Sequence, residues 1–155
     1  MDRPQFEIDA ACVQDALAFL APLMEHAVHA PAVGQSGVLY AVVMNPARHP
    51  GSASFEDAVL FEQACGKPRA AWDADYAAYA RKKARVSWST GMDSGAARTA
   101  GAWRELGHEA PLPGGMVVHG IVVAVSGALP EYDEVLAGVI ALGARAQAKL
   151  KAGAS

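Results

Sequence analysis

The stretch that decides the fold reads Gly-Ile-Val-Val-Ala-Val-Ser-Gly over residues 120–127. Its run of five apolar residues, rich in valine, predicts a buried strand. Residues 130–135 follow as Pro-Glu-Tyr-Asp-Glu-Val, which is typical of a helix start. Proline suits the first helical position, and carboxylates in the first turn favour the partial positive charge there. A strand, a Ser-Gly turn and an acidic helix start therefore succeed one another.

The helix that begins at Pro130 is expected to continue to about Lys149 and to fray beyond it. Its apolar residues recur at helical spacing and form one stripe, made up of Val135, Val139, Leu142 and Ala146. Such a stripe predicts the side of the helix that packs on the sheet. An unpaired carboxylate there, as in Val139→Asp, is expected to cost several kcal/mol.

Upstream, the sequence predicts three further strands. Residues 116–118 are expected to pair with 121–126 through His119 and Gly120, which form a two-residue hairpin signal. Val38–Met44 and residues 58–65 carry β-branched and aromatic residues and are separated by proline and glycine, so they predict a second antiparallel hairpin.

Helices are expected before, between and after these hairpins. The first is capped by Asp9, and a second is expected over about 73–88, with aspartates at its start. A shorter helix over about 96–106 would be capped by Ser94. Strands joined by hairpins and covered by helices make an α+β domain with a mainly antiparallel sheet, and we expect residues 1–155 to form one such domain.

Composition narrows the class of protein. Hydrophobic residues make up 52% of the chain and charged residues 19%, which is typical of a globular protein. The formal net charge of −3 gives no general attraction to nucleic acid or to an anionic membrane, so neither is expected as a partner. The first residues lack a signal-peptide pattern, no apolar run is long enough to span a membrane, and Cys12 and Cys65 are expected to be reduced. A cytoplasmic location is therefore expected.

Three segments together resemble the GlcG/HbpS-like haem-degrading-domain family. They are the acidic, aromatic and basic run over 73–83, the Gly-Gly turn entering a strand over 113–118, and the strand, Ser-Gly turn and acidic helix start over 120–135. The resemblance implies a profilin-like fold with a five-stranded antiparallel sheet flanked by helices, usually oligomeric. It also implies haem as a candidate cofactor, for binding or for breakdown. Pro113 stands where one branch of the family carries histidine, and His108 is the nearest alternative.

The basic cluster over 81–85 is the strongest chemical feature of the sequence. Arg81 and Arg85 lie one helical turn apart and can point together, with Lys82 on an adjacent face. Such a pair can hold a carboxylate, for example a haem propionate, in charge-assisted hydrogen bonds. The alternatives are a solvated helix face or a contact between subunits.

Two further candidates lie before the third strand. His108 is in an irregular segment, where functional loop residues concentrate, although an ordinary loop histidine fits equally well. Gly114 and Gly115 can let the backbone approach a ligand closely, or can simply form a turn that needs positive φ. His26 and His29 share a helix face without further ligands at matching spacing, so no metal site is expected.

Two classes of function follow. The first is a small-molecule-binding protein for haem or another planar or anionic ligand, with haem breakdown or redox chemistry as the corresponding activity. The second is a non-catalytic oligomeric module that serves assembly or partner binding. In both, a homo-oligomer of at least two copies is expected, from the resemblance and from the many apolar residues of a short chain. The sequence assigns no catalytic residue.

Overall fold

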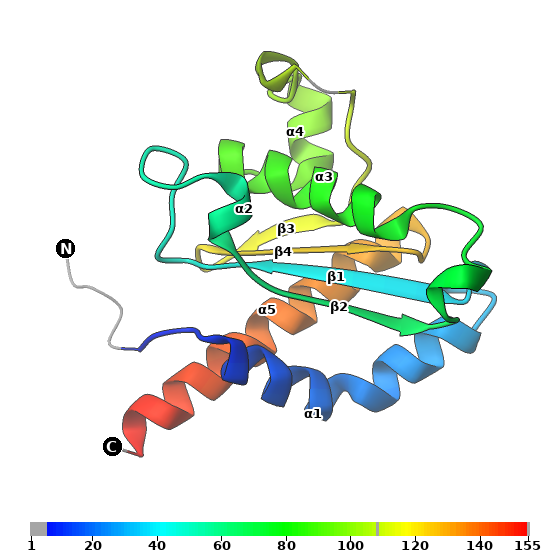
Figure 1. Cartoon of the computed structure of the whole chain (residues 1–155), viewed down its shortest axis with the longest axis horizontal. Coiled ribbons are helices and arrows are strands. Elements are labelled where there is room, and N and C mark those ends of the chain that lie inside the picture. The colour runs from blue at the N-terminus through cyan, green and yellow to red at the C-terminus, as the bar shows by residue number, and fades with distance from the viewer. Residues whose placement is uncertain (1–5, 108, 155) are drawn as a thin grey trace.

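The computed structural model describes residues 6–107 and 109–154 and contains one antiparallel sheet between helices (Figure 1). The sheet has four strands in the order β2-β1-β4-β3, with the bounds β1 Val38–Met44, β2 Val59–Gly66, β3 Gly115–Val118 and β4 Ile121–Ser126. The α+β class is confirmed, but the expectation of five strands is wrong for the described part of the chain. The long connection from β2 to β3 forms helices instead of a fifth strand, so β2 remains an edge.

Helices cover both faces of the sheet. Helix α1 (Ala10–His29) and helix α5 (Pro130–Gly153) lie on one face, and α3 (Tyr76–Thr90) lies on the other (Figure 1). This sandwich explains the continuous apolar run of β4. Val123 and Val125 pack into the core beneath α1 and α5, whereas Val122 and Ala124 pack into the core beneath α3. Every residue of β4 is therefore buried.

The side of α5 that faces the core differs from the predicted one. Val135 is 51% exposed and Leu142 48% exposed, so the predicted stripe faces away from the sheet. The buried side carries Leu136 and Ile140 together with small residues, namely Ala137, Ala141, Ala144 and Ala148. Alanines allow a helix to approach the sheet and α1 closely. The spacing of the larger apolar residues, on which the prediction was based, takes no account of this close packing. The helix also continues to Gly153, beyond the fraying expected at Lys149.

The helix boundaries follow from capping. Asp75 is the N-cap of α3, because its side chain accepts a hydrogen bond from the backbone N–H of Ala78. The helix expected over 96–106 is split into α4 (Ser94–Ala100) and a 3₁₀ turn over Arg104–Leu106, since Gly101 has a φ of +73° between them.

Two shorter features complete the fold. A one-turn helix α2 (Phe55–Ala58) precedes β2, and a 3₁₀ turn over Arg69–Ala71 follows it. In the described residues, no helix is long and apolar enough to cross a membrane. Cys12 and Cys65 are both free thiols.

Candidate functional site

The basic cluster of α3 divides between two environments. Arg81, Lys82 and Arg85 line a surface cleft of about 230 Å³ together with Phe55, Glu56 and Ala78. We call this the basic cleft. The structure thus brings the three predicted cations together, as their helical spacing requires. Lys83, between them in sequence, points the other way and is buried.

Carboxylates already pair with two of the three cations of the basic cleft. Arg81 Nε donates to Glu62 Oε1 over 2.7 Å, and a second guanidinium nitrogen donates to Glu56 over 2.9 Å. Lys82 Nζ lies 3.3 Å from Glu109 Oε2. The hydrogen bond from Arg81 lowers the pKa of Glu62, so that carboxylate stays ionised. A ligand carboxylate would have to compete with these side chains.

Arg85 is the third cation of the basic cleft and is exposed. Its guanidinium lies over the ring of Phe55, 5.5 Å from the ring centroid. Among the residues that the structure describes, it forms no ion pair. Arg85 is therefore the member of the cluster best able to accept an external anion.

Lys83 forms a buried ion pair that the sequence analysis did not single out. Its Nζ donates to Asp133 Oδ2 and to the backbone oxygen of Val125, each over 3.0 Å. The other carboxylate oxygen of Asp133 accepts a hydrogen bond from the N–H of Ala128 over 2.9 Å. Burial raises the pKa of Asp133 to about 6 and lowers that of Lys83, despite their mutual attraction. The pair joins α3, β4 and the start of α5.

Gly114 lies against this ion pair and Gly115 against Ser87 and the backbone oxygen of Lys83, so neither glycine is in the basic cleft. Gly114 has a φ of +132°, and a Cβ there would lie 2.8 Å from Lys83 Nζ. A Cβ at Gly115 would lie 2.5 Å from Ser87 Oγ. The close approach that these glycines permit is thus to the protein's own α3. His108, the other predicted residue of this segment, lies outside the described residues.

Ser94 is the first residue of α4 and not, as predicted, its cap, and its side chain holds the Gly-Gly turn in place. Its hydroxyl donates to the backbone oxygen of Leu112 over 2.7 Å and accepts from the N–H of Gly115 over 2.9 Å. The side chain of Asp93, at the N-cap position of α4, accepts from the N–H of Val117 over 2.8 Å. The segment over residues 91–95 therefore holds β3 in place.

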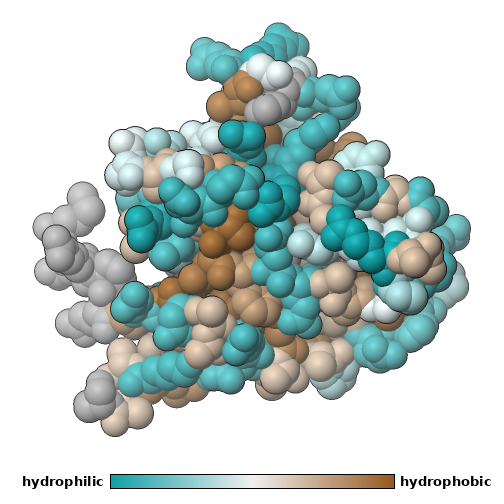
Figure 2. Space-filling model, viewed as in Figure 1, coloured by the Kyte–Doolittle hydropathy of each residue, from teal (hydrophilic) through white to brown (hydrophobic). Residues whose placement is uncertain are grey.

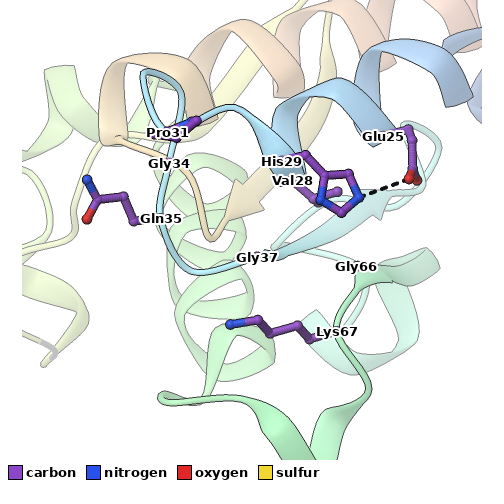
Figure 3. A pocket seen from close by; sticks show the side chains of 9 residues that line it. All are labelled: Glu25, Val28, His29, Pro31, Gly34, Gln35, Gly37, Gly66 and Lys67. Carbon is purple, nitrogen blue, oxygen red and sulfur yellow. Dashed lines mark hydrogen bonds and ion pairs between the residues drawn. The ribbon is translucent and has the colours of Figure 1, made fainter.

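A cavity of about 800 Å³ lies where α1 ends and β2 meets the loop before β1 (Figure 3). His29 lies 3.0 Å from Glu25 on the same helix, and Lys67 reaches along the backbone at Gly37. Gln35 points away from these groups. The polar groups do not converge on one point, and the cavity is open to solvent, so it offers little to a specific ligand.

A second large cavity, of about 710 Å³, lies at the opposite end of β1, and we call it the His–Arg cavity. Its polar groups include His49, His119 and Arg145, with Glu7 as the acidic residue of the lining. Its apolar wall is formed by Phe6, Ile8 and Ile121. Pockets of about 300–1,000 Å³ with apolar walls and a few polar groups are the usual sites of small ligands.

Three polar side chains of the His–Arg cavity have no side-chain partner among the described residues, whereas that of Asn45 accepts a hydrogen bond from the N–H of Ala47. In the described part of the chain, Arg145 has no ion pair, and neither histidine has a side-chain hydrogen bond. His119 is held at the turn between β3 and β4 with a φ of +51°, which few non-glycine residues adopt. Within residues 6–107 and 109–154, no three His, Cys, Asp or Glu side chains cluster as a metal site.

No protein-family model matches this chain, and no curated protein does. The assignment of a site therefore depends on the residues themselves. Sequence reasoning placed the candidate ligand at Arg81, Lys82 and Arg85 and did not select His49 or Arg145. The cavity is built from the N-terminal segment, the loop after β1, the β3–β4 turn and α5. These four segments are far apart in the sequence, so no local spacing pattern predicts that they meet.

Proposed function

We propose that this chain binds a small ligand with a planar apolar body and a carboxylate, and that the ligand occupies the His–Arg cavity. The observation that carries the proposal is the conjunction, around about 710 Å³, of an apolar wall with one guanidinium and two imidazoles that have no side-chain partner among the described residues. Haem, which the resemblance to the GlcG/HbpS-like family implies, combines these properties and is the ligand to test first.

The lining residues fit the chemistry of such a ligand. Phe6, Ile8 and Ile121 would contact the planar body, and Arg145 would hold a carboxylate in charge-assisted hydrogen bonds. His49 or His119 would supply the imidazole nitrogen that haem iron accepts as an axial ligand. When bound, haem would bring redox and oxygen chemistry that none of these side chains has. Because Glu7 also lines the cavity and Arg145 is its one arginine among the described residues, only one of the two haem propionates is expected to lie inside it, near Arg145.

The basic cleft is the second candidate for the ligand, and it is supported less well. Its volume of about 230 Å³ is below the usual range for a small-ligand site. Arg81 and Lys82 are already paired with glutamates, so only Arg85 offers an unpaired charge among the described residues. A propionate bound there would leave the body of the ligand outside the cleft.

A haem titration of the full chain, followed at the Soret band, tests the proposal. We expect saturable binding of one haem per chain. Arg145→Ala should weaken it about tenfold to a hundredfold, since a charge-assisted hydrogen bond contributes about 1.5–3 kcal/mol. His49→Ala or His119→Ala should change the position of the Soret band, because the iron would lose an axial ligand.

The controls separate the two candidate sites. Arg104→Ala removes an arginine outside both and should leave the affinity unchanged. If Arg85→Ala weakens haem binding and Arg145→Ala does not, the ligand lies in the basic cleft and the proposed site is wrong. If the wild-type chain gives no saturable change, haem is not the ligand, and the non-catalytic module becomes the better hypothesis.

A further inference from the structure

The outer side of α5 is an apolar surface that no described part of the chain covers. Val135, Val139, Leu142 and Ala146 form this outer stripe, with Val135 and Leu142 about half exposed at 51% and 48%. Phe19, on α1 in the same layer, is 78% exposed. Leucine and phenylalanine side chains turned outward on adjacent helices are typical of an interface with another protein.

Charges of opposite sign mark the two ends of the outer stripe. Glu131 lies at its N-terminal end and Lys149 at its C-terminal end, and both are exposed. About five helical turns separate them, so they lie on the same side of α5. They are also equidistant from Ile140 along the helix. An antiparallel copy of α5, centred at Ile140, would therefore bring each glutamate to the lysine of the other helix.

The position of Gly138 on the outer side of α5 fits the same antiparallel arrangement. Nothing lies within 4 Å of where a Cβ at Gly138 would be, so the backbone is uncovered there. Gly138 and Leu142 are equidistant from Ile140, as are Glu131 and Lys149. In the antiparallel arrangement, Leu142 of each helix would thus lie over the glycine of the other, which is a large residue placed on a small one.

We infer that α5 pairs with α5 of a second copy of this chain, antiparallel, about a twofold axis at the level of Ile140. A twofold interface must be self-complementary, so each residue finds its partner at the mirrored position. The outer side of α5 meets this condition twice, in the charges of Glu131 and Lys149 and in the pairing of Gly138 with Leu142. The pairing is argued from the outer side of α5 and not from the proposed ligand, although Arg145, which lines the His–Arg cavity, lies on the same helix.

Sedimentation of the full chain over a wide concentration range tests the pairing. We expect a reversible dimer of twice the 16.1 kDa chain mass. Leu142→Glu should weaken the dimer about a hundredfold, since the symmetry places two carboxylates in the apolar interface. Leu112→Glu is the matched control, because Leu112 is also 48% exposed but lies in the loop before β3, and it should leave the dimer unchanged.

A charge exchange tests the antiparallel register. Lys149→Glu should weaken the dimer about tenfold, because two glutamates would then face each other at both ends. Adding Glu131→Lys to the same chain should restore the affinity to within about threefold of the wild type. Both positions are exposed, so thermal melting should confirm that every variant is folded. A chain that is monomeric at all concentrations, a dimer indifferent to Leu142→Glu, or a charge exchange that fails to restore affinity would each overturn the inference.

Discussion

At the scale of single residues, the ion pair of Lys83 and Asp133 has the greatest consequence for stability. Both side chains are less than 5% exposed and lie 3.0 Å apart. Lys83→Met leaves a buried carboxylate without its cation and is expected to lower the free energy of unfolding by about 3–5 kcal/mol. The double variant Lys83→Met/Asp133→Leu removes both charges and should recover most of this loss.

Urea unfolding of the two variants measures the difference. Lys82→Met is the control, since Lys82 neighbours Lys83 in sequence but makes a surface pair with Glu109, and it should change the stability by less than about 1 kcal/mol. If Lys83→Met unfolds at the urea concentration of the wild type, the pair does not hold the three elements together.

The carboxyl group of Asp133 leads to a second prediction, on how the stability of the fold depends on pH. Burial raises its pKa to about 6 from an ordinary value of 3.8. A group whose pKa is raised in the folded state stabilises that state at low pH and ceases to do so as the pH rises through the folded pKa. Relative to Asp133→Asn, the wild type should therefore lose up to about 3 kcal/mol of stability between about pH 4 and pH 7.

Carbon-13 NMR of the Asp133 carboxyl carbon gives the direct measurement, with an expected midpoint near the pKa of about 6. The stability difference between the wild type and Asp133→Asn is then measured by urea unfolding at each pH. A midpoint below 3.8, or a difference that grows in favour of the wild type as the pH rises, would contradict the assignment.

At the scale of elements, the Gly-Gly turn sets the distance between β3 and α3. A Cβ at Gly114 would lie 2.7 Å from the backbone oxygen of Val125, and its φ of +132° is unfavourable for alanine. Gly114→Ala should therefore cost at least about 2 kcal/mol of stability, measured by urea unfolding. Gly51→Ala, where a Cβ would meet nothing within 4 Å, is the control and should change stability by less than about 0.5 kcal/mol.

The orientation of α5 leads to a further prediction, on the stability of variants at this scale. Ile140 is fully buried against the sheet, whereas Leu150 is 68% exposed near the end of the helix. Ile140→Ala should lower the free energy of unfolding by about 2–5 kcal/mol, because it removes buried methyl groups and leaves a cavity. Leu150→Ala, the control, should have little effect. Equal effects of the two substitutions would mean that the helix is rotated relative to the structure described above.

At the scale of the whole molecule, the strands of the sheet are unequally protected from solvent. Strand β4 is central and buried, while β2 has β1 as its one neighbouring strand among the described residues. Figure 2 shows apolar residues over the part of the surface where Figure 1 places β2, whose Val59, Leu60 and Phe61 are half-buried. An open apolar edge is a common place for local opening and strand addition.

Hydrogen exchange measures this inequality. Amides of β4 that bond to β1 should exchange only through global unfolding, because the strand has partners on both sides. Amides of β2 that point away from β1 should exchange fastest in the sheet, since no strand accepts from them in the described structure. Comparable protection of both sets would indicate that a further strand covers the edge in solution.

Local rules placed most elements from the sequence. The apolar run over 121–125 was recognised as a buried strand, because a strand covered by helices on both faces has no polar side to interrupt it. The aspartates at the start of the second helix could be recognised, and one of them, Asp75, is its cap, since capping depends on residues within one turn. The α+β class followed from the order of these elements.

Tertiary structure decided what depends on the meeting of distant segments. The basic run over 81–85 predicted which residues share a helix side, but only the packing of α3 on β4, next to Asp133 at the start of α5, made Lys83, and not Arg81, the buried cation. The apolar residues of α5 allowed either of two sides of the helix to face the core. The periodicity predicted the side with Val135 and Leu142, but the side with the alanines fits closely and is the buried one. His49, His119 and Arg145 line one cavity although they are far apart in the chain, because the sheet brings the loop after β1 to the turn before β4 and to α5. Sequence spacing encodes contacts within an element, whereas contacts between elements depend on packing volume that no local pattern contains.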